Sequence, residues 1–99
     1  MGKPQVVDVD SSEVSVTLIE THGETFRLVV RPHGAPDARR STEFRIVGVE
    51  PRVWWVNGTG GDGGPGDGLD GVTTDVRAHF VLVRMPLVAA DLEFTPSSY

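Results

Sequence analysis

The stretch from Glu13 to Arg31, EVSVTLIETHGETFRLVVR, predicts the fold of this chain. Its apolar residues recur at every second position, at Val14, Val16, Leu18, Phe26, Leu28 and Val30. Strict alternation of this kind is typical of a β-strand that has one buried face. Residues 22–24, His-Gly-Glu, interrupt the alternation with a turn sequence, so the stretch predicts an antiparallel hairpin.

Other segments repeat the pattern or are short and apolar, and they predict strands at 5–9, 43–49, 53–56, 72–84 and 87–94. Residues 32–42 hold two prolines and show no periodicity, which predicts a loop. Because 72–84 is long for one strand, we expect a bend or bulge near Ala78, and Pro86 is expected to end the strand. A short helical turn fits only at Ala89-Ala90.

The pattern as a whole predicts an all-β fold, since no apolar stripe has helical spacing. About seven strands favour an antiparallel β-sandwich, Ig-like or jelly-roll-like, with a small β-barrel as the alternative. Ninety-nine residues are enough for one domain, spanning 1–99. The chain has no cysteine, so no disulfide supports the fold.

Eight of the twelve glycines lie in residues 57–71, NGTGGDGGPGDGLDG. Glycine loses much backbone entropy on ordering, so we expect a long loop whose ordering is repaid by a contact. Asp62, Asp67 and Asp70 are the only candidates for a metal site there, because calcium prefers carboxylate oxygens. Their spacing fits neither the EF-hand loop nor the calcium-binding nonapeptide, so we assign no metal and no cofactor.

Trp54 and Trp55 are adjacent on a predicted strand, so one side chain should point inward and the other outward. An outward tryptophan is a strong sign of a contact surface, because indole offers a large rigid area. We therefore predict a partner-binding surface at Trp54, Trp55 and Asn57, together with Arg39 and Arg40 of the predicted loop.

The charge of the chain limits its partners. A formal net charge of -5 argues against binding to nucleic acid, although Arg27, Arg31, Arg45 and Arg77 would form a basic stripe if they shared one sheet. There is no apolar segment of membrane-spanning length and no secretion signal. We expect a soluble protein, cytoplasmic or incorporated into a particle.

The three histidines, His22, His33 and His79, are scattered, so no catalytic residue is assigned and we expect no enzyme activity. The leading hypothesis is a structural or interaction module. Its partner is a protein, either itself or other subunits of an assembly such as a phage or other virion. The alternatives are a calcium- or carbohydrate-binding β-sandwich module and, third, a small enzyme.

Overall fold

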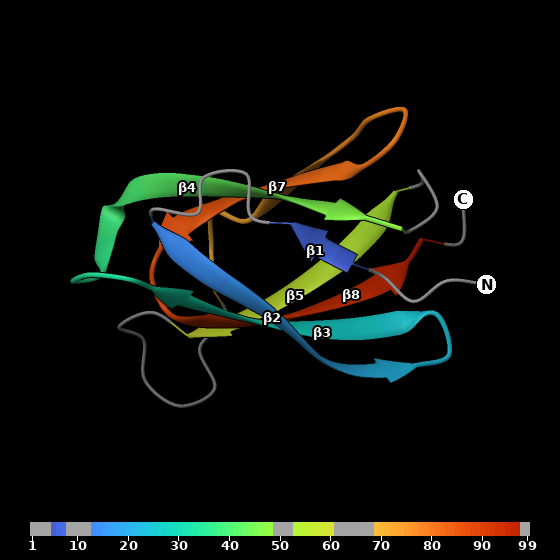
Figure 1. Cartoon of the computed structure of the whole chain (residues 1–99), viewed down its shortest axis with the longest axis horizontal. Coiled ribbons are helices and arrows are strands. Elements are labelled where there is room, and N and C mark those ends of the chain that lie inside the picture. The colour runs from blue at the N-terminus through green and yellow to red at the C-terminus, as the bar shows by residue number, and fades with distance from the viewer. Residues whose placement is uncertain (1–4, 8–12, 49–52, 61–68, 98–99) are drawn as a thin grey trace.

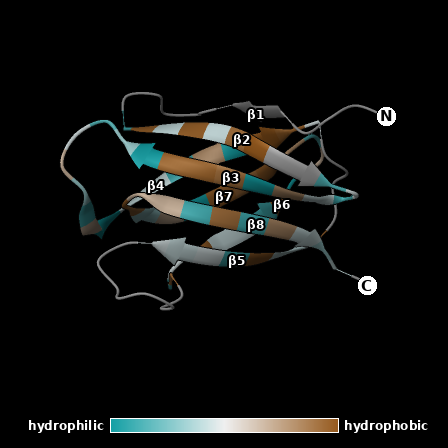
Figure 2. Cartoon of the chain, turned by 90° about the horizontal axis from the view of Figure 1, so that it is seen from below, coloured by the Kyte–Doolittle hydropathy of each residue, from teal (hydrophilic) through white to brown (hydrophobic). Residues whose placement is uncertain are grey.

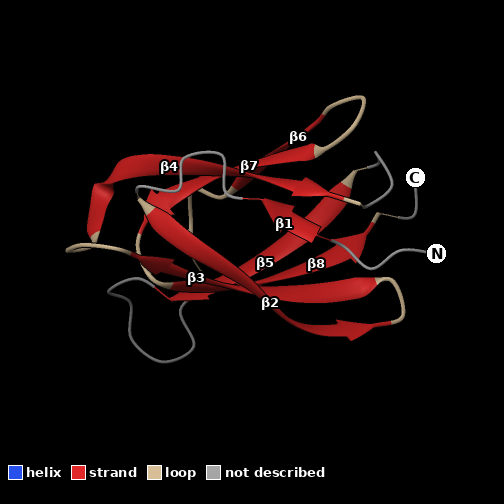
Figure 3. Cartoon of the chain, in the orientation of Figure 1, coloured by secondary structure: helices blue, strands red, loops and turns tan. Residues whose placement is uncertain are grey.

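The computed structural model describes residues 5–7, 13–48, 53–60 and 69–97 of the chain (Figure 1). All regular secondary structure in these ranges is β-strand (Figure 3). The strands are β1 (Gln5–Val7), β2 (Val14–His22), β3 (Thr25–Pro32), β4 (Asp37–Val47), β5 (Trp54–Gly60), β6 (Thr73–Val76), β7 (Val81–Leu87) and β8 (Ala90–Pro96). Within the described ranges, no helix is long and apolar enough to cross a membrane.

The eight described strands form two antiparallel sheets of four, which confirms the predicted all-β class. Sheet 1 has the order β1-β4-β7-β6, and sheet 2 has the order β2-β3-β8-β5 (Figure 2). The β2–β3 and β6–β7 neighbours are hairpins, whereas the other consecutive described strands lie in different sheets. This arrangement is consistent with a β-sandwich.

The β2–β3 hairpin forms where the alternation predicted it. Val14 pairs with Pro32 at its open end and His22 pairs with Thr25 at its closed end. Gly23 makes the turn with a φ of 62°, in the left-handed region that glycine adopts without steric cost. One register shift, between Leu18 and Glu20, interrupts the ladder as a β-bulge does.

One hydrophobic core joins the two sheets. Its buried residues are Val14, Phe26, Leu28, Val30, Phe44, Ile46, Trp54, Val81, Val83, Met85, Leu87, Val88, Ala90, Leu92 and Phe94. They come from β2, β3, β5 and β8 of sheet 2 and from β4 and β7 of sheet 1, almost always at every second position, with Val88 added from the turn after β7. Period-two alternation therefore places one face of each sheet in the shared core.

An aromatic group anchors the sheet 2 side of this core. The ring of Phe26 stacks on that of Phe94, with centroids 4.9 Å apart, and meets the edge of Trp54 at 5.2 Å. These three residues come from the neighbouring strands β3, β8 and β5. Offset-stacked and edge-to-face contacts add about 0.5–1.5 kcal/mol per pair to the gain from burial.

The prediction of a loop over 32–42 is wrong in its second half, because β4 begins at Asp37. The side chains of residues 38–41 are exposed, so this part of the strand has no apolar alternation to reveal it. Its pairing with β7 is also irregular, since the register jumps from Asp37↔Leu87 to Ser41↔Pro86. Proline lacks an amide hydrogen and is tolerated at such an irregularity, so Pro86 lies inside β7 instead of ending it.

The segment 72–84 is not one bent strand but a hairpin, because the chain reverses between β6 and β7. The amide of Arg77 donates to the carbonyl of Phe80 across the turn, at 2.9 Å. The apolar alternation of the sequence runs on through the turn to Leu82, which concealed the reversal. The inward positions nevertheless change from even to odd numbers there, since Val76 is opposite the buried Val81. The last predicted strand is also shifted: β8 begins at Ala90, after a tight turn in which Val88 N–H donates to Pro86 O, and no helical turn forms there.

The predicted glycine loop is shorter than expected, because β5 continues through Asn57 to Gly60. Gly60 has a φ of 131°, and a Cβ at that position would lie 2.5 Å from the carbonyl oxygen of Ala89. Part of the glycine enrichment in residues 57–71 therefore has a packing cause. Residues 61–68 of the predicted loop lie outside the described residues.

We predict that Gly60→Ala lowers the free energy of unfolding by about 3 kcal/mol, because it combines a disallowed φ with a backbone clash. Chemical denaturation measures the loss. Gly34→Ala is the matched control, since nothing lies within 4 Å of the added Cβ, and its effect should stay within about 0.5 kcal/mol. Equal effects of the two substitutions would contradict this packing of β5 against the β7–β8 turn.

Candidate surface on the beta5 edge

The adjacent tryptophans point to opposite faces of sheet 2, as the sequence predicted. Trp54 is 8% exposed and belongs to the core, whereas Trp55 is 61% exposed. The indole Nε1 of Trp54 is buried without a hydrogen-bond partner, so its burial rests on packing alone. Only Trp55 of the pair can meet a partner directly, and the prediction of partner contact narrows to that residue.

Trp55 lies on the outer face of β5 together with Val53 just before the strand, Asn57 and Thr59. All four are exposed, and Val53 is 57% exposed. Val53 and Trp55 are two residues apart, so their side chains lie next to each other on the same face. We call this set the β5 outer face. The sequence prediction missed Val53 because alternation does not reveal which face of a short apolar strand is buried.

Part of the outer edge of β5 has no backbone hydrogen-bond partner among the described residues. The carbonyl of Val53 accepts from Ser97 N–H, next to β8, whereas the carbonyl of Gly58 accepts from Leu69 N–H on the opposite side. Backbone groups alternate sides along a strand, so those of Trp54 and Val56 point away from β8, as those of Gly58 do. No described strand pairs with them there. Leu69 therefore covers the end of the edge near Gly58, and no described residue covers the tryptophan end.

The composition of β5 sets it apart from the other long edge strand of sheet 2. Its seven residues, WWVNGTG, include no charge and no proline, and its register with β8 is regular. By contrast, β2 has a register shift after Leu18. Charges, prolines and bulges are the devices that keep edge strands from pairing with other chains. Within the described chain, β5 has none of them.

Polar and charged residues of β8 and β3 lie beside the β5 outer face. Trp55 is opposite Thr95 of β8, and Asn57 is opposite Glu93. One strand further, Arg27 of β3 binds Asp91 of β8 through Nη2 and Oδ2, at 2.5 Å. The exposed apolar area thus has a hydrogen-bonding and charged border on its β8 side, as protein interfaces commonly have.

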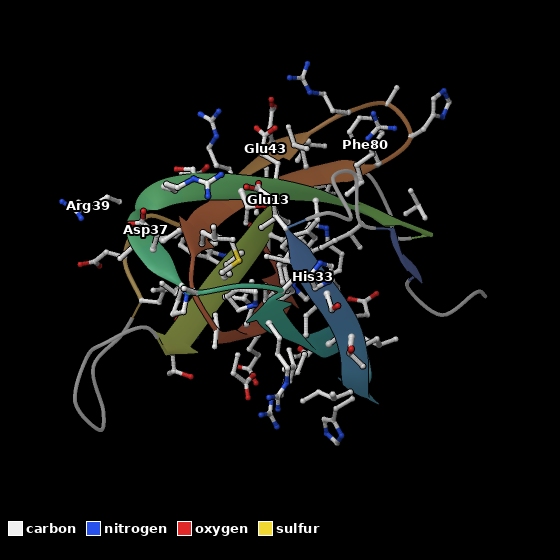
Figure 4. All side chains as sticks on the ribbon, turned by 60° about the vertical axis from the view of Figure 1, so that its left-hand side comes forward. Glu13, His33, Asp37, Arg39, Glu43 and Phe80 are labelled. Carbon is white, nitrogen blue, oxygen red and sulfur yellow. The ribbon has the colours of Figure 1, made fainter. Side chains whose placement is uncertain are left out.

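Arg39 and Arg40, the predicted cationic contacts, lie on β4 and thus in sheet 1, away from the strand that carries Trp55 (Figure 4 labels Arg39). Arg40 is held by Glu13 through Nη2 and Oε2, at 2.5 Å. The amide of Arg39 donates to the carboxylate of Asp37, while its side chain extends into solvent. Arg39 and Arg40 therefore lie in a different sheet from Trp55, and the residues of the predicted partner-binding surface do not share one strand.

The aspartates proposed as low-ranked metal ligands are only partly described. Asp70 is exposed, and Asp62 and Asp67 lie outside the described residues. Across the described ranges, no group of three His, Asp or Glu side chains is placed to hold a metal ion. A calcium site at residues 57–71 gains no geometric support from the described part of the chain.

All three histidines are exposed and lie far apart in the topology, at the β2–β3 turn, after β3 and in the β6–β7 turn. His33 Nε2 lies 2.7 Å from Ser15 Oγ, so one histidine does meet a hydroxyl (Figure 4). The nearby carboxylate of Glu13 is engaged by Arg40. No described carboxylate orients the His33 ring, a role that a serine–histidine pair needs in acyl transfer.

The four arginines expected on outer faces do not form a single stripe. Arg27 and Arg31 belong to β3 in sheet 2, whereas Arg45 belongs to β4 in sheet 1 and Arg77 follows β6. Arg27 and Arg77 are also neutralised by Asp91 and Asp75. The continuous basic track that would hold a nucleic-acid backbone is absent from these four positions.

Comparisons with known proteins give no relative for this chain: no family model, no curated protein and no solved structure matches it. The functional argument therefore depends on the geometry above.

We predict that the two indoles respond oppositely to a solvent quencher. Trp54→Phe leaves only Trp55, whose fluorescence acrylamide should quench strongly because most of the side chain is exposed. Trp55→Phe leaves only the buried Trp54, whose quenching constant should be several-fold smaller. Similar quenching of the two variants in the folded state would contradict the assigned faces of β5.

Proposed function

We propose that this protein is a non-enzymatic interaction module that associates with further copies of itself through the β5 edge, as a component of a larger assembly. The proposal is supported by two features that occur together on the first half of β5. The uncovered backbone groups of Trp54 and Val56 lie where the exposed side chains of Val53 and Trp55 also lie.

An uncharged edge favours a second copy over an unrelated partner. Two copies of β5 can pair antiparallel about a twofold axis, because the same donors and acceptors then face each other from both sides. Such pairing would extend sheet 2 across the two copies and bring the two Trp55 side chains to the same face. Since β5 carries no charge, the paired strands would place no like charges opposite each other.

The covered end of β5 would limit the length of the pairing. The Leu69–Gly58 hydrogen bond, 2.7 Å long, occupies the edge beyond Asn57. Only the tryptophan half of the strand remains for a partner, so each contact would be short and individually weak. A short twofold contact of this kind would form a reversible dimer, which would be the unit of the larger assembly.

Carbohydrate binding is the second candidate, and one observation favours it. Trp55 offers an open indole face, while Asn57 and Glu93 supply hydrogen-bonding groups in the adjacent row of the sheet. A sugar ring stacked on Trp55 would change the fluorescence of the Trp54→Phe variant, in which Trp55 is the only indole. A panel of glycans tested on that variant, with no fluorescence change, would remove this candidate.

We predict that Trp55→Lys reduces self-association, because a lysine on an edge strand opposes pairing with another copy. Sedimentation velocity at protein concentrations from about 20 µM to about 1 mM should show a rising average mass for the wild type and a constant monomer mass for the variant. The unfolding free energy should change by less than about 1 kcal/mol, since Trp55 is exposed.

Ile19→Lys is the matched control, because Ile19 is the third large exposed apolar residue of the described chain and lies on the opposite edge strand, β2. Its mass should rise with concentration as in the wild type. A wild-type protein that stays monomeric throughout the range would contradict self-association. Equal loss in both lysine variants would show that the association is not specific to β5.

A further inference from the structure

The outer face of sheet 1 carries a cavity that the β5 surface does not involve. It is open to solvent, measures about 460 Å³, and lies where the β6–β7 turn meets β4. Its lining residues are Glu43, Arg45, Arg77, Ala78, His79, Phe80 and Leu82. Figure 4 shows Glu43 and Phe80 on this side of the molecule, with Phe80 close to the β6–β7 turn. Cavities of this size are typical of sites for small organic molecules.

The cavity is positively charged although the chain is acidic. Two guanidinium groups, those of Arg45 and Arg77, line it against one carboxylate, that of Glu43. Glu43 is engaged by Arg84, with Nε and Oε2 3.3 Å apart, and Arg77 is engaged by Asp75 at 2.6 Å. Among the described residues Arg45 has no carboxylate partner, so it holds the uncompensated positive charge of this part of the chain.

The guanidinium of Arg45 contacts an aromatic ring. Its Cζ lies 4.6 Å from the centroid of the Phe80 ring, over the ring face. A cation over a ring face is attracted by the ring quadrupole, and a guanidinium has five N–H donors to offer an anion. The guanidinium fork suits bidentate binding of a carboxylate.

The rest of the lining indicates what the anion should be attached to. Phe80, Leu82 and Ala78 give the cavity an apolar wall next to the guanidinium groups. A dianion such as phosphate would bring a second negative charge toward Glu43. It also has no apolar part to contact the apolar wall. A carboxylate on a compact apolar body satisfies both the charge and the wall.

We propose that this cavity binds a small organic acid, with the carboxylate on Arg45 and the apolar body against Phe80 and Leu82. The proposal is independent of β5 pairing, because β4 and the β6–β7 hairpin belong to sheet 1 and β5 belongs to sheet 2. Arg77 would contribute a second, weaker donor, since Asp75 shares its charge.

The test is a titration of the ¹⁵N-labelled protein with sodium benzoate, followed by amide chemical shifts at constant ionic strength. We expect saturable shifts of the amides at 43–45 and 77–82 with a dissociation constant of about 1 mM, in keeping with so small a ligand. Benzyl alcohol, which has the same ring without the charge, and inorganic phosphate, which has charge without the ring, should both bind at least several-fold more weakly.

Substitutions assign the contact to Arg45. Arg45→Gln should weaken benzoate binding about tenfold, and Arg45→Lys should also weaken it, because lysine keeps the charge but not the planar fork. Arg31→Gln, which removes an exposed arginine of sheet 2, should leave the binding unchanged. Unchanged amide shifts of β2, β3 and β8 show that each variant is folded.

Three results would overturn the proposal. The first is the absence of saturable benzoate shifts in this region, and the second is binding of benzyl alcohol as tight as that of benzoate. The third is equal weakening by Arg31→Gln and Arg45→Gln, which would mean that benzoate responds only to overall charge.

Discussion

The burial of one face of each sheet in a common core is the constraint on which the rest of the structure depends. Phe26 makes the clearest contribution, because it stacks on Phe94 and meets Trp54 edge-on, linking three neighbouring strands of sheet 2. The inward direction of Trp54 forces Trp55 outward, since successive side chains of a strand point to opposite faces. The exposure of the Trp55 indole is therefore a consequence of core packing. Its position beside the outer edge of β5 would let it contact a second copy.

Each of the two open sheets has two edge strands, and the edge strands of sheet 2 differ in the features that oppose pairing with another chain. On the long edge strand β2, a register shift opposes pairing, whereas on β5 the hydrogen bond from Leu69 at Gly58 is the one backbone contact on the outer edge among the described residues. The uncovered half is uncharged and carries Trp55. The cavity around Arg45 lies on the other sheet, so association through β5 and binding of an organic acid would not compete for the same residues.

The sequence predicted the parts of the fold in which burial alternates, such as the β2–β3 hairpin and the Phe44–Ile46 part of β4. The prediction failed where the pattern of apolar residues does not follow the pattern of burial. Residues 38–41 of β4 are all exposed, and the apolar alternation of the sequence continues through the β6–β7 turn, although the inward positions change from even to odd numbers there. In the candidate sites, the opposite faces of the tryptophan pair followed from strand geometry. The stacking of Arg45 on Phe80 depends on residues 35 positions apart, which no local pattern can reveal.

The most direct test of the account is the exchange of the β5 backbone amides with deuterium at low and high protein concentration. The amides of Trp54 and Val56 should exchange rapidly in dilute solution and become protected as the concentration rises, because they point to the open edge. The amides of Trp55 and Asn57, which face β8, should be protected at both concentrations. Exchange of Trp54 and Val56 that does not depend on concentration would contradict the central claim that this edge pairs with a second copy.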